Sequence, residues 1–240
     1  MGGIKGILFD KDGTLLDFNR TWIQPYRQAT AYLYKRFGSS ADPDILMKRG
    51  GFIAESETWQ PDSLLASGCN REIIDFWAEV IGQPIEGADE QAIASIFTLP
   101  PGAYVPVVDD MERLLAELHQ YGIKLGLATM DNEANAHSML QAIGAEALFD
   151  FVCGADSGHG TKPGPGMVRA FCQACGLQSN QVLMVGDSPK DLNMGRNAGV
   201  ALTVGVLTGA HRKAELAPCA DMVLENIAGL KSVIDSGYGG

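Results

Sequence analysis

The sequence lacks the features that would indicate a secreted, membrane or nucleic-acid-binding protein. Its longest apolar run near the N-terminus, Ile7 to Phe9, is too short for a signal peptide or a membrane span. Basic residues number 18 against 29 acidic ones, and the net charge of −11 repels nucleic-acid phosphates and anionic membranes at long range. We therefore expect a cytoplasmic protein with neither nucleic acid nor membrane as a partner.

Cysteine is also scarce, and its pattern excludes a disulfide framework. The five cysteines form an odd number without the spacing of a disulfide-rich domain. One C-x-x-C pair, Cys172 and Cys175, lies inside a segment with a helical pattern, and no second pair completes a zinc site. We interpret these two residues as small buried apolar side chains one helical turn apart.

What is present is a pattern of apolar segments that divides the chain into two parts. Residues 4–9 predict a short buried strand, whereas 18 to about 100 show helical spacing with almost no strand signal. Beyond a Pro-Pro-Gly break at 100–102, strands alternate with helices. The predicted strands span 123–129, 149–154, 181–186, 200–206 and 222–224, and the predicted helices 109–121, 133–143, 165–175 and 189–198.

This alternation indicates βαβ units and therefore a parallel sheet. We predict an α/β fold: a doubly wound parallel sheet with a Rossmann-like core formed by 1–17 and 103–240. A small helical domain, 18–102, is inserted after the first strand. In such a sheet ligands bind beyond the carboxyl ends of the strands, so the polar residues at those ends are the candidates for function.

The first strand ends in Asp10-Lys11-Asp12-Gly13-Thr14. Side chains two apart on an extended segment point to the same side, so Asp10 and Asp12 are expected to converge. Two close carboxylates suit a cation such as Mg²⁺, and they also supply a nucleophile and a nearby acid or base. Gly13 allows a sharp turn. The alternative is a polar turn that ends a strand, because Asp-Gly turns are common.

Other strand ends carry a hydroxyl, a lysine and two carboxylates. Thr129 could hydrogen-bond a phosphoryl oxygen or simply help to start the next helix. Lys162, in a loop rich in glycine and proline, could offset negative charge or be a solvated loop lysine. Ser188 and Asp191 fit a capping box, which alone could explain Asp191. Asp187 is not explained by the cap and would complete a Mg²⁺ site with the Asp10 strand.

These residues resemble the haloacid dehalogenase superfamily, and within it the phosphatases similar to phosphoglycolate phosphatase. The segment from Asp10 to Asp17 is similar to the first motif of that family, Thr129 to the second and Lys162-Pro163 to the third. The segment from Gly186 to Gly199 is similar to the fourth, and 18–102 resembles the small helical cap domain of the family. The first and fourth motifs are specific, whereas the other two are short.

The resemblance implies a covalent mechanism. Asp10 would attack phosphorus and form an aspartyl-phosphate, and Asp12 would protonate the leaving oxygen and then activate water. Thr129 and Lys162 would hold the phosphoryl group. The residues expected to contact the substrate are Gly13, Thr14, Thr129 and Lys162.

The resemblance also implies a Mg²⁺ cofactor. Asp10, the backbone carbonyl of Asp12, and Asp187 would bind the ion, with Asp191 nearby. We therefore expect a phosphoric monoester hydrolase that acts on a small phosphorylated metabolite, such as phosphoglycolate or a similar ester. The residues expected at the metal are Asp10, Asp12, Asp187 and Asp191. The oligomeric state is not predicted.

One position departs from the family pattern, and several alternatives stay open. Many relatives carry Asn after the second-motif threonine, where this chain has Met130. Either a hydrogen bond to phosphate or substrate is then missing, or Asp131 or Asn132 replaces it. A phosphonate-cleaving hydrolase would use a cap lysine, for which Lys48 is the candidate. A phosphomutase would keep the same core residues. A non-catalytic phospho-accepting signalling domain is disfavoured by the helical insert, and a dehalogenase by Asp12.

Overall fold

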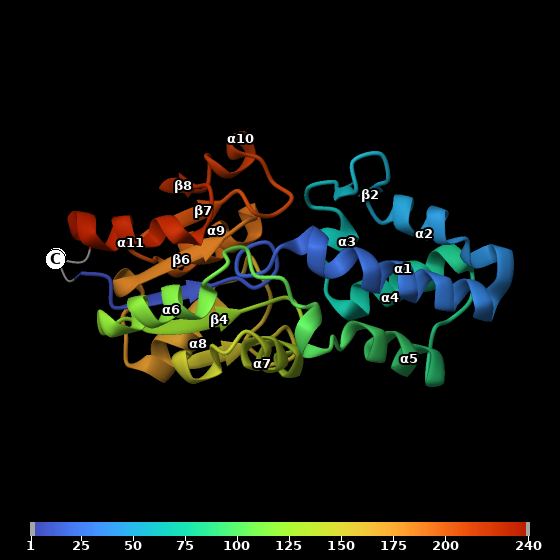
Figure 1. Ribbon diagram of the computed structural model, residues 1–240, viewed down its shortest axis with the longest axis horizontal. Coiled ribbons are helices and arrows are strands. Elements are labelled where there is room, and N and C mark those ends of the chain that lie inside the picture. The colour runs from blue at the N-terminus through green and yellow to red at the C-terminus, as the bar shows by residue number, and fades with distance from the viewer. Residues whose placement is uncertain (1–2, 239–240) are drawn as a thin grey trace. The chain divides into compact units, whose positions relative to one another are not determined.

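The computed structural model describes residues 3–238, and the chain forms two compact units (Figure 1). The core unit comprises 1–17 and 104–240, and the insert unit comprises 18–103. Each unit is described by itself below. That the insert acts as a cap stays a prediction.

The core unit is built on a six-stranded sheet in the order β5-β4-β1-β6-β7-β8, and every neighbouring pair is parallel. The central strand β1 pairs with both β4 and β6, and its last residue, Phe9, lies opposite Leu127 and Val185. The carboxyl ends of these three strands therefore meet at one edge of the sheet. The strands are β1 (Gly6–Phe9), β4 (Lys124–Ala128), β5 (Phe151–Cys153), β6 (Val182–Gly186), β7 (Leu202–Val206) and β8 (Met222–Leu224).

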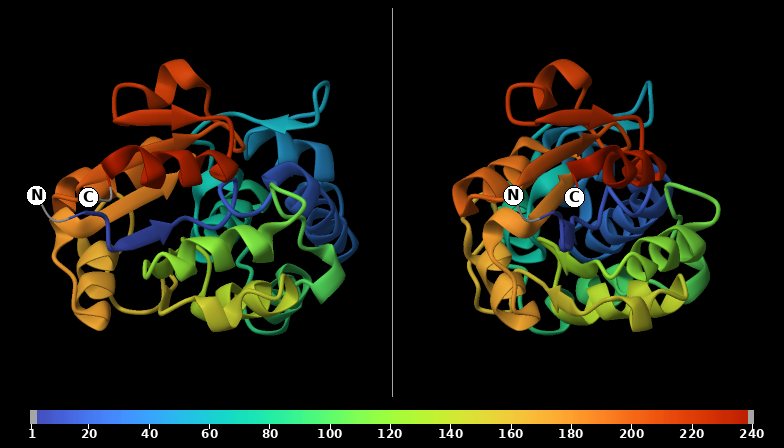
Figure 2. Two further views of the ribbon diagram at one scale, coloured as in Figure 1. Left: turned by 60° about the vertical axis from the view of Figure 1, so that its left-hand side comes forward. Right: turned by 90° about the vertical axis from the view of Figure 1, so that its left-hand side faces the viewer.

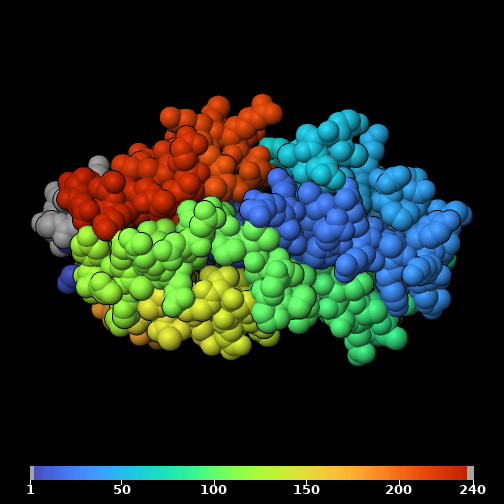
Figure 3. Space-filling model, in the orientation of Figure 1, coloured from blue at the N-terminus to red at the C-terminus, as the bar shows by residue number. Residues whose placement is uncertain are grey.

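Helices cover both faces of this sheet, which confirms the predicted doubly wound α/β fold. Figure 2 shows α8 and α9 on the side of the sheet opposite to α6 and α11. Figure 3 shows the segments of α6 and α11 side by side at the surface, where Lys231 Nζ lies 2.9 Å from Glu117 Oε2. The helices are α6 (Met111–Gln120), α7 (Glu133–Ala142), α8 (Gly166–Cys175), α9 (Pro189–Ala198), α10 (Lys213–Leu216) and α11 (Leu230–Val233), with a π-helical turn at Ile234–Tyr238. Single 3₁₀ turns lie at Glu146–Leu148, Ser179–Gln181 and Ile227–Gly229.

A buried apolar layer joins the sheet to α8 and α9. Leu8 and Met184 from the strands pack in one cluster with Phe171 of α8 and Met194 of α9, all fully buried. Burial of side chains of this size contributes about 2 kcal/mol each to the stability of the fold. Cys172 belongs to the same cluster, and burial raises the pKa of its thiol. This confirms its interpretation as a buried apolar residue.

The helix that follows β6 begins and ends as its sequence predicts. Ser188 is the N-cap of α9, and the carboxylate of Asp191 accepts a hydrogen bond from the Ser188 backbone N–H at 3.1 Å. Gly199 ends the helix in the left-handed region, with φ +73°. The capping box therefore fixes Asp191, four positions after Asp187, at the same edge of the sheet.

The insert unit is mainly helical and contains one short hairpin that its sequence did not indicate. Two-residue strands are too short to show an alternating pattern. The N-cap of the helix that begins at Asn70 is Cys69, whose backbone N–H donates to Glu72 Oε2. The elements are α1 (Phe18–Phe37), a 3₁₀ turn (Gly38–Ala41), α2 (Pro43–Arg49), β2 (Phe52–Ile53), β3 (Thr58–Trp59), α3 (Leu64–Ser67), α4 (Asn70–Ile81), α5 (Ala88–Phe97) and a 3₁₀ turn (Pro101–Ala103).

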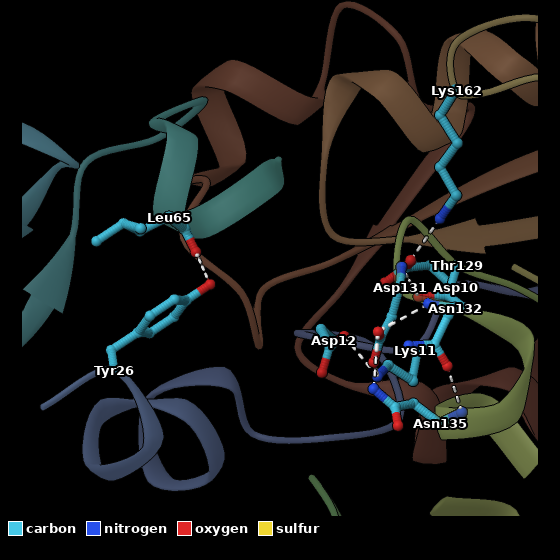
Figure 4. Close-up of polar contacts among 10 residues, drawn as sticks. All are labelled: Asp10, Lys11, Asp12, Tyr26, Leu65, Thr129, Asp131, Asn132, Asn135 and Lys162. Carbon is cyan, nitrogen blue, oxygen red and sulfur yellow. Dashed lines mark hydrogen bonds and ion pairs between the residues drawn. The ribbon is translucent and has the colours of Figure 1, made fainter. Parts of the chain in front are cut away.

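Aromatic side chains form the interior of the insert unit. The Tyr26 ring lies 5.1 Å from that of Trp59 and 5.3 Å from that of Phe97, and Trp22 packs edge-on against Phe97. Tyr26 Oη donates a hydrogen bond to the carbonyl of Leu65 at 2.7 Å (Figure 4). Trp22 and Tyr26 are thus core residues of the insert unit. Within residues 3–238, no helix is both long enough and apolar enough to cross a membrane.

Candidate active site

Three buried carboxylates meet at the carboxyl edge of the sheet. Asp10 follows β1, Asp187 follows β6, and Asp191 lies in the first turn of α9. One carboxylate oxygen from each residue lies within 4.8 Å of the other two. The neighbouring positions of β1 and β6 in the sheet bring these residues together, although 177 positions separate Asp10 from Asp187 along the chain. We call this group the acidic cluster.

Lys162 places a positive charge against the acidic cluster. It lies in the loop between β5 and α8, and it is only 6% exposed. Its Nζ donates to Asp10 Oδ1 and lies 2.6 Å from Asp191 Oδ1. Burial alone would lower the pKa of Lys162, but the Asp10 and Asp191 carboxylates raise it above its ordinary value. The side chain is therefore a fixed cation and not a solvated loop lysine.

When all three carboxylates of the acidic cluster are ionised, they carry more negative charge than Lys162 can offset. Burial raises the pKa of Asp10 to about 7, against the lowering effect of the Lys162 ammonium. Burial, and then the Asp10 and Asp191 carboxylates, raise the pKa of Asp187 well above its usual range. Asp10 Oδ2 is buried and has no hydrogen-bond partner within the described part of the chain. A buried, unsatisfied oxygen among three carboxylates fits a hard divalent cation with oxygen ligands, so these residues suit Mg²⁺.

Asp12 lies outside the acidic cluster. The chain turns directly after Asp10, and the backbone N–H of Leu15 donates to the carbonyl of Lys11 at 2.9 Å. The Asp12 carboxylate is not part of the group of three, although its charge contributes to the raised pKa of Asp10. It lies 3.2 Å from Lys11 Nζ, and its side chain is 20% exposed. Convergence of the Asp10 and Asp12 side chains on one metal site stays a prediction. A metal contact through its backbone carbonyl stays a prediction.

Position 13 requires glycine for two reasons: its backbone has a positive φ, and a Cβ atom would have no room there. Its φ is +84°, and a Cβ there would lie 2.6 Å from Asp187 Oδ2. The carbonyl of Gly13 accepts a hydrogen bond from Thr208 Oγ1 at 2.6 Å. Thr208 was missed by sequence reasoning, although a Thr-Gly pair just beyond a predicted strand is the kind of signal that identified the other residues. Thr14 is fully buried, and among residues 3–238 its hydroxyl has no hydrogen-bond partner.

The second-motif segment follows β4, next to β1. Thr129 is buried, and its Oγ1 accepts a hydrogen bond from the backbone N–H of Asp131 at 3.0 Å. Asn132 caps α7, because its Oδ1 accepts from the Asn135 backbone N–H at 2.7 Å. The Asp131 carboxylate contacts Lys11 at 2.5 Å (Figure 4). The two residues that could have replaced Asn at the Met130 position are thus bound to protein groups.

Comparison with known proteins places this chain in a family. A family model described as haloacid dehalogenase-like hydrolase matches residues 4–199. A phosphoglycolate phosphatase of Rhodospirillum rubrum is 39% identical over 83% of this chain and 78% of its own length. A validoxylamine A 7'-phosphate phosphatase of Streptomyces hygroscopicus subsp. limoneus is 29% identical over 93% and 94%.

The fold agrees with this placement. The crystal structure of a predicted phosphoglycolate phosphatase from Haemophilus somnus has a TM-score of 0.70 at 21% identity, covering 97% of this chain and 99% of that one. The expected resemblance is therefore confirmed, as is the expectation of a hydrolase of the phosphoric monoester class. The chain belongs to the haloacid dehalogenase-like hydrolases.

Proposed function

We propose that this protein is a Mg²⁺-dependent phosphatase that transfers a phosphoryl group from a small phosphate ester first to Asp10 and then to water. The proposal rests mainly on the hydrogen bonding of the two oxygens of the Asp10 carboxylate. One of its oxygens is held by Lys162, while the other is buried without a hydrogen-bond partner in residues 3–238. A carboxylate that is fixed in position and poorly solvated is suited to attack phosphorus.

The surrounding residues would stabilise the negative charges on the phosphoryl oxygens. Asp10, Asp187 and the backbone carbonyl of Asp12 would bind Mg²⁺, with Asp191 beside them. The ion would offset negative charge on the phosphoryl oxygens. The Lys162 ammonium would add a second positive charge at the same place. Thr129 Oγ1 already accepts a hydrogen bond from a backbone N–H, so its own proton can be donated to a phosphoryl oxygen.

Asp12 would transfer protons in both halves of the reaction. In the first half, Asp10 forms its bond to phosphorus while the bond to the leaving oxygen breaks, and Asp12 donates a proton to that oxygen. In the second half, Asp12 takes a proton from the water that attacks the phosphorus of the aspartyl-phosphate, which releases phosphate and restores Asp10. Its partial exposure suits this role, because an acid must reach the leaving group.

The partner we propose is a small-molecule phosphate ester, with phosphoglycolate as the first candidate. A relative named as a phosphoglycolate phosphatase is 39% identical to this chain over 213 aligned residues. The insert unit would act as the cap that excludes water and selects the substrate. An imine-forming lysine needs burial or a neighbouring charge to keep it unprotonated. Lys48 is exposed in the last turn of α2, so this residue does not support a phosphonate-cleaving function.

The first test is phosphate release from 4-nitrophenyl phosphate, with Mg²⁺ and with EDTA. The test compares wild type with Asp10→Asn and with a control variant, Asp109→Asn. Asp109 is a suitable control because its side chain is exposed. We expect release to require Mg²⁺, to disappear in Asp10→Asn and to persist in the control. Full activity in Asp10→Asn would show that another group is the nucleophile.

A substrate panel then tests the proposed substrate class. It should contain phosphoglycolate, sugar phosphates, nucleotides, a phosphonate and a phosphopeptide. We expect the highest kcat/KM for a small phosphomonoester. Turnover of nucleotides or phosphopeptides alone would contradict the proposed substrate, and isomerisation of a sugar phosphate without release of phosphate would identify a mutase.

A further inference from the structure

Lys11 is a fully buried lysine that the proposed mechanism does not use. It lies between the two aspartates that follow β1, and its Nζ is 2.5 Å from Asp131 Oδ2 and 3.2 Å from Asp12 Oδ2 (Figure 4). Lysine is seldom fully buried unless it is paired. Lys11 is therefore a cation that bridges two carboxylates.

Asp131 is the fixed end of this bridge. Its Oδ1 accepts hydrogen bonds from Asn135 Nδ2 at 3.0 Å and from the Asn132 backbone N–H at 2.7 Å. Both donors lie at the start of α7, and the side chain of Asp131 is only 8% exposed. The position of Lys11 Nζ is thus set by the end of a helix, and that ammonium in turn limits where the Asp12 carboxylate can lie.

The bridge is built on a different lysine from the one in the acidic cluster. Lys162 pairs with Asp10 and Asp191, whereas Lys11 pairs with Asp12 and Asp131. A buried ion pair usually stabilises a fold no better than apolar side chains of similar size would. Stability alone therefore gives weak reason for a lysine at position 11. The more exposed end of the bridge is Asp12, the residue that the proposed mechanism uses for proton transfer.

We infer that Lys11 and Asp131 are positioning residues that hold the Asp12 carboxyl group within reach of the leaving-group oxygen. The inference rests on the proposed function, because it needs Asp12 to act as the acid. A proton donor is effective only when it is held at hydrogen-bond distance from the atom that receives the proton. Lys11 itself exchanges no proton in this scheme; it orients the group that does.

The test uses two esters of similar shape, phenyl phosphate and 2,4-dinitrophenyl phosphate. Phenolate is a poor leaving group that needs a proton, whereas 2,4-dinitrophenolate leaves without one. The ratio of the two kcat/KM values reports protonation in the first half of the reaction, up to formation of the aspartyl-phosphate. The variants are Lys11→Met, which keeps the length of the side chain, and Asp131→Asn, which keeps its shape. Lys5→Met is the control, because Lys5 is an exposed lysine just before β1.

For Lys11→Met we expect kcat/KM on phenyl phosphate to fall about tenfold to a hundredfold, with little change on 2,4-dinitrophenyl phosphate. Asp131→Asn should change the ratio in the same direction by a smaller factor, and it serves as the test if Lys11→Met does not fold. An equal loss of kcat/KM on both esters, or no loss on either, would overturn the inference about Lys11 and Asp131. The proposed phosphatase function would not be affected by that result. A wild-type protein inert to every ester would instead overturn the proposed function, and this inference with it.

Discussion

Lys162 Nζ donates a hydrogen bond to Asp10 Oδ1, although 152 positions separate the two residues in the chain. Lys162 also contacts Asp191, so a single ammonium holds carboxylates that follow two different strands. The contact depends on the strand order, in which β1 and β6 are neighbours and the β5–α8 loop delivers the lysine. The strand order therefore determines both the placement of the Asp10 and Asp191 carboxylates and the position of the ammonium that pairs with them.

Replacing Lys162 by methionine tests the importance of this charge. Lys162→Met keeps the length of the side chain but removes the cation from beside Asp10. Removing one fixed donor from a site of developing negative charge usually costs about a hundredfold to a thousandfold in rate. We expect a loss of that size in kcat/KM for 4-nitrophenyl phosphate. Lys213→Met, which changes an exposed lysine, should keep wild-type activity; a similar loss there, or none in Lys162→Met, would contradict this role.

The raised pKa of Asp10 makes the stability of the metal-free protein depend on pH. Its carboxyl has a pKa of about 7 in the folded chain, against an ordinary value of 3.8, so the folded state binds the proton more tightly. The resulting stability is fully present below about pH 4 and is lost as the pH rises through about 7. In EDTA, thermal denaturation should therefore show Tm falling from about pH 5 to pH 8.

Mg²⁺ should reverse part of this loss, because it binds the ionised carboxylates. The rise in Tm on adding Mg²⁺ should grow over the same pH range and be largely absent in Asp187→Asn. Asp109→Asn, which alters an exposed carboxylate, should respond to Mg²⁺ as wild type does. A Mg²⁺ effect independent of pH, or one that persists in Asp187→Asn, would exclude the acidic cluster as the metal site.

A double-mutant cycle measures the coupling between Lys11 and Asp131. Each single variant, Lys11→Met or Asp131→Asn, leaves a buried charge without its partner, which usually costs about 3 kcal/mol of unfolding free energy. The double variant should lose less than the sum of the two, with a coupling of about 1–3 kcal/mol in urea denaturation. The surface pair Arg113 and Glu117 in α6 should show a coupling of no more than about 0.5 kcal/mol. Strict additivity for Lys11 and Asp131 would show that the bridge is not formed in solution.

The sequence predicts the sheet well, because buried parallel strands are short apolar runs separated by amphipathic helices. The predicted helix over 189–198 agrees with α9 at both ends, since Ser188, Pro189 and Gly199 are local signals for a cap, a first turn and a stop. Predicted strands were longer than the observed ones by up to three residues, because the residue pattern does not show where strand pairing ends.

The side-chain arrangement of the site could be predicted only in part. The approach of Lys162 to Asp10 follows from the strand order and from the rule that ligands bind at the carboxyl edge. The contact of the Asp12 carboxylate with Lys11 could not be predicted, because it depends on a turn between Lys11 and Leu15 that residue spacing does not reveal. The pairing of Lys11 with Asp131 spans 120 positions, and no local pattern distinguishes it from a solvated lysine.

The most direct test of the covalent mechanism is to trap the phosphoryl group on the protein. Wild type and Asp10→Asn should be mixed with 2,4-dinitrophenyl phosphate and Mg²⁺, quenched in acid within one turnover, digested and mapped by mass spectrometry. The account predicts one phosphoryl group on the peptide that contains Asp10 in wild type, and none in Asp10→Asn. A phosphoryl group on a different residue, or turnover in wild type without any phosphorylated peptide, would contradict it.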